Sequence, residues 1–469
     1  MKQKIAVVSL GDCRRAFYET RKHIAVEETE KLIEALGELY EVYAPETVFS
    51  IDEALMVADE IRRRLIVQVV IHIPIWVTPN LVLRIANSTP YPVVLFGNTR
   101  KDSSSTVALL ASAGVLSQSG KKYKRVIGDI REESVKKQVQ DLLNAVYVAE
   151  GLRRSSYGMI GGRSIGIGTT VADPMQWQRL FGVEFDHCDQ YEIVYRAKDQ
   201  DPQRVKKHMD WIKEHFTIQY GGLFTEETLE RQVRSYLALK DMAIEHCYNF
   251  MGVKCQPDMS DHFVLQCLGV ALLNGNLDAD GEKEPIPTSC ECDCDGAITM
   301  KILSLCAGKQ PSCLVDIRYF SGEEKELILA NCGSMAPYFA DPKNPDNAMR
   351  ETWLLEHVFG LAGGGAVQMV AKSGPITCAR LIRENGEYIL TCFTGEIYEK
   401  PREELKKTTF SYPTQFIRAD IDYEKFFQTM NANHLHTVYG NYKEVLKNFC
   451  EITGIRFLCY DRENKEVAD

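Results

Sequence analysis

The chain has 469 residues, of which 45% are apolar and 26% are charged, enough for about three domains with buried cores. Its 65 acidic residues outnumber its 55 basic residues, so the formal net charge is −10. A chain this acidic lacks the basic surface that nucleic acids and anionic membranes require. We therefore expect neither as a partner.

The N-terminal residues and the cysteines favour a cytoplasmic protein. The sequence begins MKQKIAVVSLGD, which lacks the longer apolar region and cleavage site of a secretory signal. No apolar run approaches the roughly 18 residues of a membrane span. The 15 cysteines are odd in number and irregularly spaced, which is typical of reduced thiols rather than of a disulfide framework.

Strand-like and helix-like patterns alternate over the first 150 residues. Strands are expected at residues 5–10, 39–43, 66–73 and 91–96, and helices at residues 20–36 and 51–64. This alternation predicts parallel βαβ units with helices on both faces of a sheet. Ligands bind such sheets at the carboxyl ends of the strands, where we expect Asp12, Arg14, Arg15, Trp76 and Asn98.

The pattern changes after about residue 307. Between residue 161 and this change lies a second βα region, with expected helices at 203–215 and 225–249. After it come strand patterns at 314–320, 326–331, 377–383 and 387–393, a hairpin signal at Asn385-Gly386, and a helix at 442–453. The sequence therefore predicts three domains, at residues 1–154, 155–306 and 307–469.

The segment ECDCDG at residues 291–296 brings three carboxylates close together. If the backbone is extended, Glu291, Asp293 and Asp295 share one face and the cysteines share the other. Crowded carboxylates repel one another unless a cation or protons intervene, so the segment is either a metal site or a solvated acidic edge. The C-x-C-x-C spacing lacks the C-x2-C pairs of zinc sites, which favours packing as the role of the thiols.

Two other segments carry candidate ligands. Asp316 lies in the apolar strand pattern 313–317, where an unpaired charge is costly; either Arg318 or a metal ion would compensate it. His434 and His436, in NANHLHTVYG, would share one face of a strand, an arrangement often used to bind metals.

Eight segments extend these observations over nearly the whole sequence. In chain order they are GDCRRAFYETR, IGGRSIGIGTTVADP, ECDCDGAITMKILSL, LVDIRYF, LANCGS, AGGGAVQMVAKSGPITCARL, SYPTQF and NANHLHTVYGNYKEVLKNFCEITGI. In this collinear set the chain resembles the L-fucose isomerase family and, more distantly, L-arabinose isomerase. It is shorter than the long bacterial fucose isomerases, and so resembles a compact, divergent member.

The resemblance implies an α/β fold, with two Rossmann-like doubly wound α/β domains followed by a C-terminal β-barrel-like domain, assembled as a hexamer. It implies a divalent-metal-dependent aldose–ketose isomerase (a ketol isomerase of class EC 5.3.1) that uses Mn2+, Co2+ or Mg2+ and a cis-enediol intermediate. The metal ligands would be Glu291, Asp316 and His434, with His436 as the second choice for the histidine. Glu291 and Asp316 would also be the acid/base pair.

The resemblance also implies a set of substrate contacts: Arg14, Trp76, Lys254, Asn331, Cys332, Tyr412, Asn433 and His436. Arg14 and Trp76 would serve the site of a neighbouring subunit. Tyr412, Cys332 and Lys254 stand where the long fucose isomerases have Trp, Ser and Gln. These departures leave the sugar open among deoxy, pentose and modified sugars, and Lys254 with Arg163 would suit an anionic or sulfonated one.

Two other functions stay open at this point. A non-catalytic sugar-binding or sensor protein has a similar βα architecture, although a pure binder would not need Glu291, Asp316 and His434. A metal-dependent aldolase or epimerase would use the same enediolate chemistry with different products.

Overall fold

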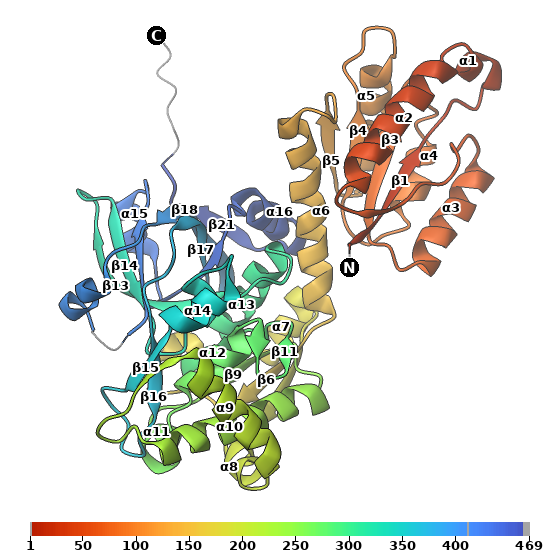
Figure 1. Ribbon diagram of the computed structural model, residues 1–469. Coiled ribbons are helices and arrows are strands. Elements are labelled where there is room, and N and C mark those ends of the chain that lie inside the picture. Colours follow the sequence, from red (N-terminus) through yellow and green to blue (C-terminus); the bar gives the residue numbers. More distant parts are fainter. Residues whose placement is uncertain (1, 410–411, 463–469) are drawn as a thin grey trace. The chain divides into compact units, whose positions relative to one another are not determined.

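The computed structural model describes residues 2–409 and 412–462 and consists of two compact units, residues 1–150 (unit 1) and 151–469 (unit 2) (Figure 1). Each unit mixes helices with strands, as the sequence predicts. No helix in the described ranges is long and apolar enough to cross a membrane.

Unit 1 contains a five-stranded parallel sheet in the order β2-β1-β3-β4-β5. Its strands are β1 (Lys4–Ser9), β2 (Glu41–Tyr43), β3 (Gln68–Ile73), β4 (Val93–Gly97) and β5 (Tyr123–Ile127). Its helices are α1 (Arg15–Glu19), α2 (Lys22–Gly37), α3 (Ile51–Arg63), α4 (Leu81–Ala86), α5 (Ser105–Gln118) and α6 (Glu133–Arg153), which extends into unit 2.

Both faces of this sheet are buried. On β1, Ile5 and Val7 pack with residues of α2 and α6, whereas Ala6 and Val8 pack with residues of α3, α4 and α5. Successive strand residues point to opposite faces, so the continuous apolar run of β1 supplies both layers. The carboxyl ends of β1, β3 and β4 lead into the segments that carry Arg14, Trp76 and Asn98, as predicted.

Unit 2 begins with a four-stranded parallel sheet in the order β12-β9-β6-β7 and a three-stranded sheet in the order β16-β15-β8. These strands are β6 (Ser156–Ile160), β7 (Glu184–Cys188), β8 (Thr217–Gln219), β9 (Phe250–Val253), β12 (Thr288–Ser289), β15 (Trp353–Glu356) and β16 (Gly365–Gln368); β10 (Leu277–Asp278) and β11 (Gly281–Glu282) form a small hairpin. The helices are α7 (Pro174–Phe181), α8 (Tyr191–Lys198), α9 (Pro202–His215), α10 (Glu226–Glu245), α11 (Asp258–His262), α12 (Cys267–Asn274) and α13 (Cys294–Cys306). The helix predicted over 225–249 is therefore α10, and it ends four residues earlier than expected.

A larger, mixed sheet occupies the C-terminal part of unit 2, in the order β17-β20-β13-β14-β19-β18-β21. Its strands are β13 (Cys313–Ser321), β14 (Glu326–Ala330), β17 (Gly374–Glu384), β18 (Glu387–Ile397), β19 (Thr414–Arg418), β20 (His434–Tyr439) and β21 (Arg456–Cys459), accompanied by α14 (Pro345–Glu351), α15 (Tyr423–Thr429) and α16 (Lys443–Thr453). Because β17 also pairs with β18, the strand pairings from β17 round to β18 form a closed ring.

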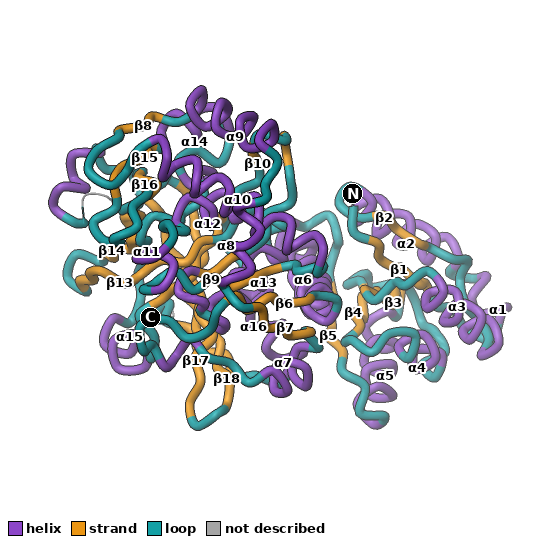
Figure 2. The backbone as a smooth tube through the Cα atoms, turned by 90° about the horizontal axis from the view of Figure 1, so that it is seen from below, coloured by secondary structure: helices purple, strands orange, loops and turns teal. Residues whose placement is uncertain are grey.

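Strands β17 and β18 form a hairpin (Figure 2). Its turn is the predicted Asn385-Gly386. Both residues have positive φ, 50° and 86°, as a type I′ turn requires. One hydrophobic cluster joins the parallel and mixed sheets of unit 2, since it includes Ile160 and Val253 as well as Val315 and Leu435. The pairing of β13 with β20 inside this core positions the candidate site.

Candidate active site

Three predicted metal ligands meet in unit 2. Asp316 on β13 lies directly opposite His434 on β20 in the antiparallel register. Glu291 reaches the same point from η2, a short 3-10 helix at Cys290–Cys292. The Nε2 atom of His434 lies 3.2 Å from Glu291 Oε2 and 3.6 Å from Asp316 Oδ1. Two carboxylates and one imidazole nitrogen thus converge from three separate elements.

Glu291 is held in an unusual conformation. Its φ is 56° and that of Cys292 is 53°, a left-handed region that is costly for residues with side chains. The Oε2 atom of Glu291 is also buried without a hydrogen bond, although His434 Nε2 lies 3.2 Å away. Backbone strain and an orphaned acceptor at one residue are typical of a ligand-binding position.

Residues 291–296 are not extended, so the condition under which Glu291, Asp293 and Asp295 would share one face does not hold. Asp293 is instead the N-cap of α13, where its Oδ1 accepts from the Gly296 amide at 2.9 Å, and Asp295 lies in the first helical turn. An N-cap aspartate followed by a helix-forming run is the sequence signal that predicts this start. The carboxylates of Glu291, Asp293 and Asp295 therefore have different partners.

Asp293 contacts the candidate metal ligand His434 through Nδ1, the ring nitrogen that does not face Glu291 and Asp316. Its Oδ2 lies 2.7 Å from His434 Nδ1 and 2.5 Å from Arg380 Nη1, and all three side chains are almost fully buried. Burial alone raises the pKa of Asp293, but Arg380 and His434 outweigh it and lower the pKa. An Nδ1–H donated to this carboxylate leaves Nε2 of His434 as the nitrogen available to a metal.

His434 carries a proton when no metal competes for it. Burial favours the neutral imidazole, but the neighbouring carboxylates of Asp293 and Glu291 outweigh it and raise the pKa of His434 to about 10. Burial is also the largest influence on Asp316, and it raises the pKa of that carboxyl. Perturbed pKa values of this kind gather at functional sites.

A second, half-buried ion pair joins the buried Asp295 to Arg383. Asp295 Oδ2 accepts from Arg383 Nε at 2.8 Å, and Asp295 Oδ1 accepts from the Tyr388 hydroxyl at 2.8 Å. Burial raises the pKa of Asp295 to about 6, although Arg383 opposes the shift. Sequence reasoning missed both arginines. The signal that identified Asp316, a charged residue in an apolar strand, also applies to Arg380 in β17.

His436 has a different environment from His434. It lies opposite Leu314 on β13, both of its ring nitrogens are buried without hydrogen bonds, and burial lowers its pKa well below the usual range. A Cβ added to Gly296 would lie 2.7 Å from His436 Nε2, so the ring packs closely against the start of α13. The structure brings His434, rather than His436, opposite Asp316.

Several predicted substrate contacts surround these ligands. Asn433 Nδ2 donates to Asp316 Oδ1 at 3.3 Å. Arg318 lies 3.4 Å from Asp316 Oδ2, so the expected ion pair is present as well. The guanidinium of Arg318 also lies 5.3 Å from the centre of the Tyr412 ring. Asn331 Oδ1 accepts from the Gly333 amide at 2.8 Å and orders the turn that carries Cys332.

The cysteines of the C-x-C-x-C segment have separate partners. Cys290 Sγ lies 3.4 Å from Cys332 Sγ, whereas Cys294 Sγ accepts from the Tyr157 hydroxyl at 3.4 Å. The backbone carbonyl of Cys332 also lies 2.6 Å from His357 Nε2. Cys290, Cys292 and Cys294 are buried, and the packing role expected for them agrees with this burial.

The remaining predicted contacts are already paired or lie in unit 1. Lys254 Nζ lies 2.6 Å from Asp258 Oδ2, so the positive charge invoked for an anionic sugar is neutralised within the chain. In unit 1, Arg14 Nη2 lies 2.6 Å from Asp12 Oδ2, and its side chain is 64% exposed. Trp76 is partly buried against the core of unit 1.

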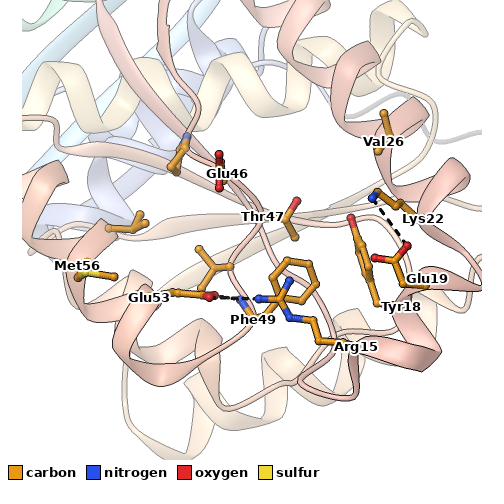
Figure 3. A pocket seen from close by; sticks show the side chains of 13 residues that line it. Arg15, Tyr18, Glu19, Lys22, Val26, Glu46, Thr47, Phe49, Glu53 and Met56 are labelled. Atoms are coloured by element: carbon orange, nitrogen blue, oxygen red, sulfur yellow. Dashed lines mark hydrogen bonds and ion pairs between the residues drawn. The ribbon is translucent and has the colours of Figure 1, made fainter.

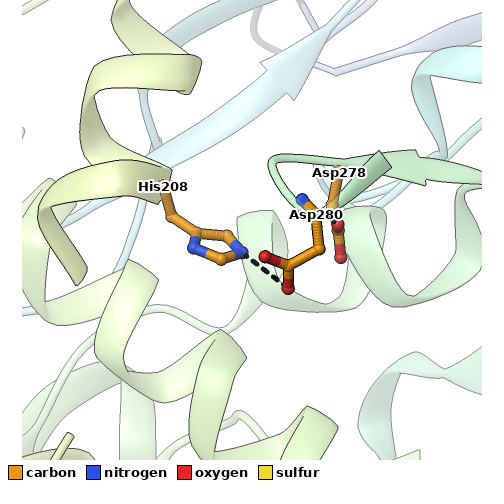
Figure 4. A group of neighbouring side chains, drawn as sticks. All are labelled: His208, Asp278 and Asp280. Atoms are coloured by element: carbon orange, nitrogen blue, oxygen red, sulfur yellow. Dashed lines mark hydrogen bonds and ion pairs between the residues drawn. The ribbon is translucent and has the colours of Figure 1, made fainter. Parts of the chain in front are cut away.

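A second group of potential ligands lies elsewhere in unit 2. Figure 4 shows His208 on α9 facing Asp278 and Asp280, with potential ligand atoms within 4.8 Å of one another. However, Lys240 Nζ lies 2.7 Å from Asp278 Oδ2 and 2.8 Å from Asp280 Oδ2. An ammonium group thus takes the place between the carboxylates that a cation would need, and Lys207 pairs with Asp280 in addition.

A pocket of about 540 Å3 lies in unit 1 beside α1, α2 and the loop that leads into α3 (Figure 3). Four of its five charged side chains are paired, since Arg15 lies 3.2 Å from Glu53 and Lys22 lies 3.7 Å from Glu19; the fifth is Glu46. The guanidinium of Arg15 also stacks on Phe49, 3.4 Å from the ring centre. The pocket therefore offers few unpaired charged groups to a ligand.

Comparison with known proteins agrees with these findings. The first N-terminal domain of L-fucose isomerase matches residues 2–153, and the C-terminal domain of L-fucose isomerase matches residues 329–460. L-fucose isomerases of Streptococcus pneumoniae strains CGSP14 and 70585 are 22% identical to this chain over 324 residues, which cover 61% of this chain and 54% of each relative.

The chain thus spans about half the length of the curated relatives it matches. His434 falls within the matched C-terminal domain, whereas Glu291 and Asp316 lie between the two matched ranges, so their roles rest on the geometry described above. With both terminal domains and curated relatives in agreement, the chain belongs to the L-fucose isomerase family.

Proposed function

We propose that this protein is a divalent-metal-dependent aldose–ketose isomerase. The observation that carries the proposal is the approach of the Glu291 and Asp316 carboxylates to Nε2 of His434, at 3.2 and 3.6 Å, in a member of the L-fucose isomerase family. A pure sugar binder, the second candidate, has no need of two carboxylates around a buried histidine.

The donor set fits an ion of the Mn2+ type. Oxygen and imidazole nitrogen donors suit Mn2+, Co2+ and Mg2+, and the orphaned Oε2 of Glu291 is an acceptor that a cation would compensate. Glu291, Asp316 and His434 would hold the ion, and His436 is the second choice for the histidine. When bound, the ion would supply Lewis-acid stabilisation of the negative charge that develops on the sugar's oxygens.

The carboxylates would move the proton. Isomerisation removes a proton from C2 of the aldose, passes through a cis-enediol, and returns a proton to C1. A carboxyl group whose pKa is raised by burial, as for Asp316, accepts and returns protons at neutral pH more readily than an exposed one. Glu291 and Asp316 are therefore the proposed acid/base pair.

The surrounding side chains would orient the sugar. In unit 2 the proposed contacts are Asn331, Cys332, Tyr412, Asn433, His436 and Lys254, and in unit 1 they are Arg14 and Trp76. The pairing of Lys254 with Asp258 favours a neutral deoxy, pentose or modified sugar over an anionic one. Arg14 and Trp76 would complete the site of a neighbouring subunit in a homohexamer.

Two further features belong to the proposal. The closed ring of strand pairings from β17 to β18 supports a β-barrel-like C-terminal domain after two Rossmann-like ones, with boundaries near residues 154 and 306. All 15 cysteines are free, which supports a reducing compartment such as the cytoplasm.

The test is product analysis by NMR. Metal-stripped protein is incubated with L-fucose, other aldoses and anionic sugars, with and without Mn2+. We expect ketose only with the metal, and loss of activity in Glu291→Gln but not in Asp280→Asn, which alters the other acidic cluster. Sugars that bind but are not converted would support the binding protein instead, and cleavage or a C2 epimer would support an aldolase or epimerase.

A further inference from the structure

Two cysteines next to the proposed active site are close enough to react with each other. Cys290 Sγ and Cys332 Sγ lie 3.4 Å apart, and a disulfide needs about 2.0 Å. Cys290 directly precedes Glu291, and Cys332 directly follows Asn331. The two thiols therefore join two segments that are 42 residues apart in the sequence.

The surroundings favour oxidation at Cys332 first. Cys332 is partly exposed, whereas Cys290 is only 5% exposed. The Cys332 turn is anchored by the Asn331 side chain and by His357 at the Cys332 carbonyl, so its sulfur is held beside Cys290. A partly accessible thiol with a second thiol beside it is the arrangement found in redox-sensitive cysteines.

We propose that Cys290 and Cys332 form an oxidisable pair that hydrogen peroxide converts reversibly into a disulfide. Peroxide oxidises the Cys332 thiol to a sulfenic acid, and one water leaves. The Cys290 sulfur then attacks the Cys332 sulfur; the S–S bond forms, the S–O bond breaks, and the hydroxyl leaves as a second water with the Cys290 proton. Two electrons pass from the two sulfurs to peroxide, and a dithiol restores both thiols by exchange.

The cross-link would also act on the proposed metal site. It would draw η2 towards the Cys332 turn and shift the backbone of Glu291, which already has a strained conformation. This second part rests on the proposed function. We expect oxidation to weaken Mn2+ binding by about tenfold or more, because displacing the surroundings of a metal ligand has effects of that size.

Peptide mapping of the reduced, metal-free full chain tests the pair directly. After brief treatment with peroxide, alkylation of free thiols and tryptic digestion without reductant, we expect residues 284–301 linked to residues 326–343. The link should disappear with dithiothreitol and in Cys290→Ser, and persist in Cys292→Ser, which removes a neighbouring thiol of the same peptide. Fragmentation of the wild-type cross-linked peptide identifies the cysteine even if a variant does not fold.

Different results would contradict the cross-link, its effect on the metal site, and the proposed function. The assignment would be overturned if Cys332 were recovered in alkylated form or oxidised to a sulfinic acid. It would also be overturned if Cys332 were linked instead to residues 255–283, which contain Cys267. Unchanged Mn2+ affinity in the cross-linked protein would overturn the coupling to the metal site. Failure of the reduced protein to bind Mn2+ would count against the proposed function, while the cross-link is still decided by the peptide map.

Discussion

His434 illustrates how buried neighbours can prepare one side chain for metal binding. Its Nδ1 faces Asp293, which is itself held by Arg380, and its Nε2 faces Glu291 and Asp316. A carboxylate behind a histidine fixes the ring orientation and its tautomer. The two nitrogens of one ring therefore have separate tasks, one structural and one directed at the ligand.

Asp293→Asn tests this arrangement. Asparagine caps a helix as well as aspartate does, so α13 should still form, but the charge that positions His434 is lost. We expect Mn2+ affinity to fall about 10–100-fold, measured by isothermal titration calorimetry. Asp295→Asn is the matched control, because it disrupts the neighbouring ion pair with Arg383 without touching His434. Equal losses of affinity in the two variants would contradict the positioning role of Asp293.

The protonation of His434 predicts how metal binding depends on pH. Its pKa is raised to about 10 in the metal-free protein, so the ion must displace a proton at neutral pH. Mn2+ affinity should therefore rise with pH, by about tenfold per unit between about pH 6 and 9, as one proton is released. Calorimetry in buffers of different ionisation enthalpy measures that proton. Binding that does not vary with pH would show that His434 Nε2 is not a ligand.

At the level of elements, the start of α13 brings the site together. Gly296 lets Asp293 and His436 approach the helix closely, because a Cβ there would lie 2.7 Å from Asp293 Oδ2 and from His436 Nε2. Glu291 precedes Asp293, the N-cap of α13, by two residues in the sequence. A substitution at this position therefore affects both packing and the proposed ligand set.

Gly296→Ala should destabilise the protein by about 1–3 kcal/mol, as overpacked cores do. Gly114→Ala in α5 is the control, because a Cβ there meets nothing within 4 Å and alanine is favoured over glycine in a helix by about 0.5–1 kcal/mol. Urea denaturation measures both free energies of unfolding. A neutral effect of Gly296→Ala would mean that the contacts around Asp293 and His436 are looser than described.

Regular elements could be predicted from the sequence, whereas much of the network around the site could not. The period of apolar residues predicted β1 and α3, and Asn385-Gly386 predicted the hairpin of β17 and β18. The extended conformation considered for ECDCDG does not form, because Asp293 caps α13 and Asp295 lies in its first turn. The partnership of Arg380 with Asp293 joins residues 87 positions apart, which local patterns do not reveal.

At the level of the whole molecule, the proposed function assigns roles to residues of each unit. The metal ligands belong to unit 2, whereas Arg14 and Trp76 belong to unit 1. The side chain of Arg14 is 64% exposed, although its guanidinium pairs with Asp12. In the proposed homohexamer, one subunit's unit 1 completes the site formed by its neighbour's unit 2.

Co-expression of Arg14→Ala with Glu291→Gln tests this arrangement. Each variant alone should be nearly inactive, but mixed oligomers contain sites with Glu291 from one chain and Arg14 from the other. Random mixing would restore about one quarter of the sites if the contact crosses a subunit interface. No recovery in purified mixed oligomers would indicate that Arg14 acts within its own chain or not at all. Isomerase assays with Mn2+ provide the measurement.

Anomalous diffraction from crystals soaked with Mn2+ tests the proposed metal centre directly, because it locates the ion without reference to activity. We expect a strong anomalous peak bonded to Glu291, Asp316 and His434, and no peak between Asp278 and Asp280, where Lys240 already lies. A peak at His208, Asp278 and Asp280, or none near His434 in metal-saturated crystals, would contradict the proposed metal centre and the isomerase mechanism built on it.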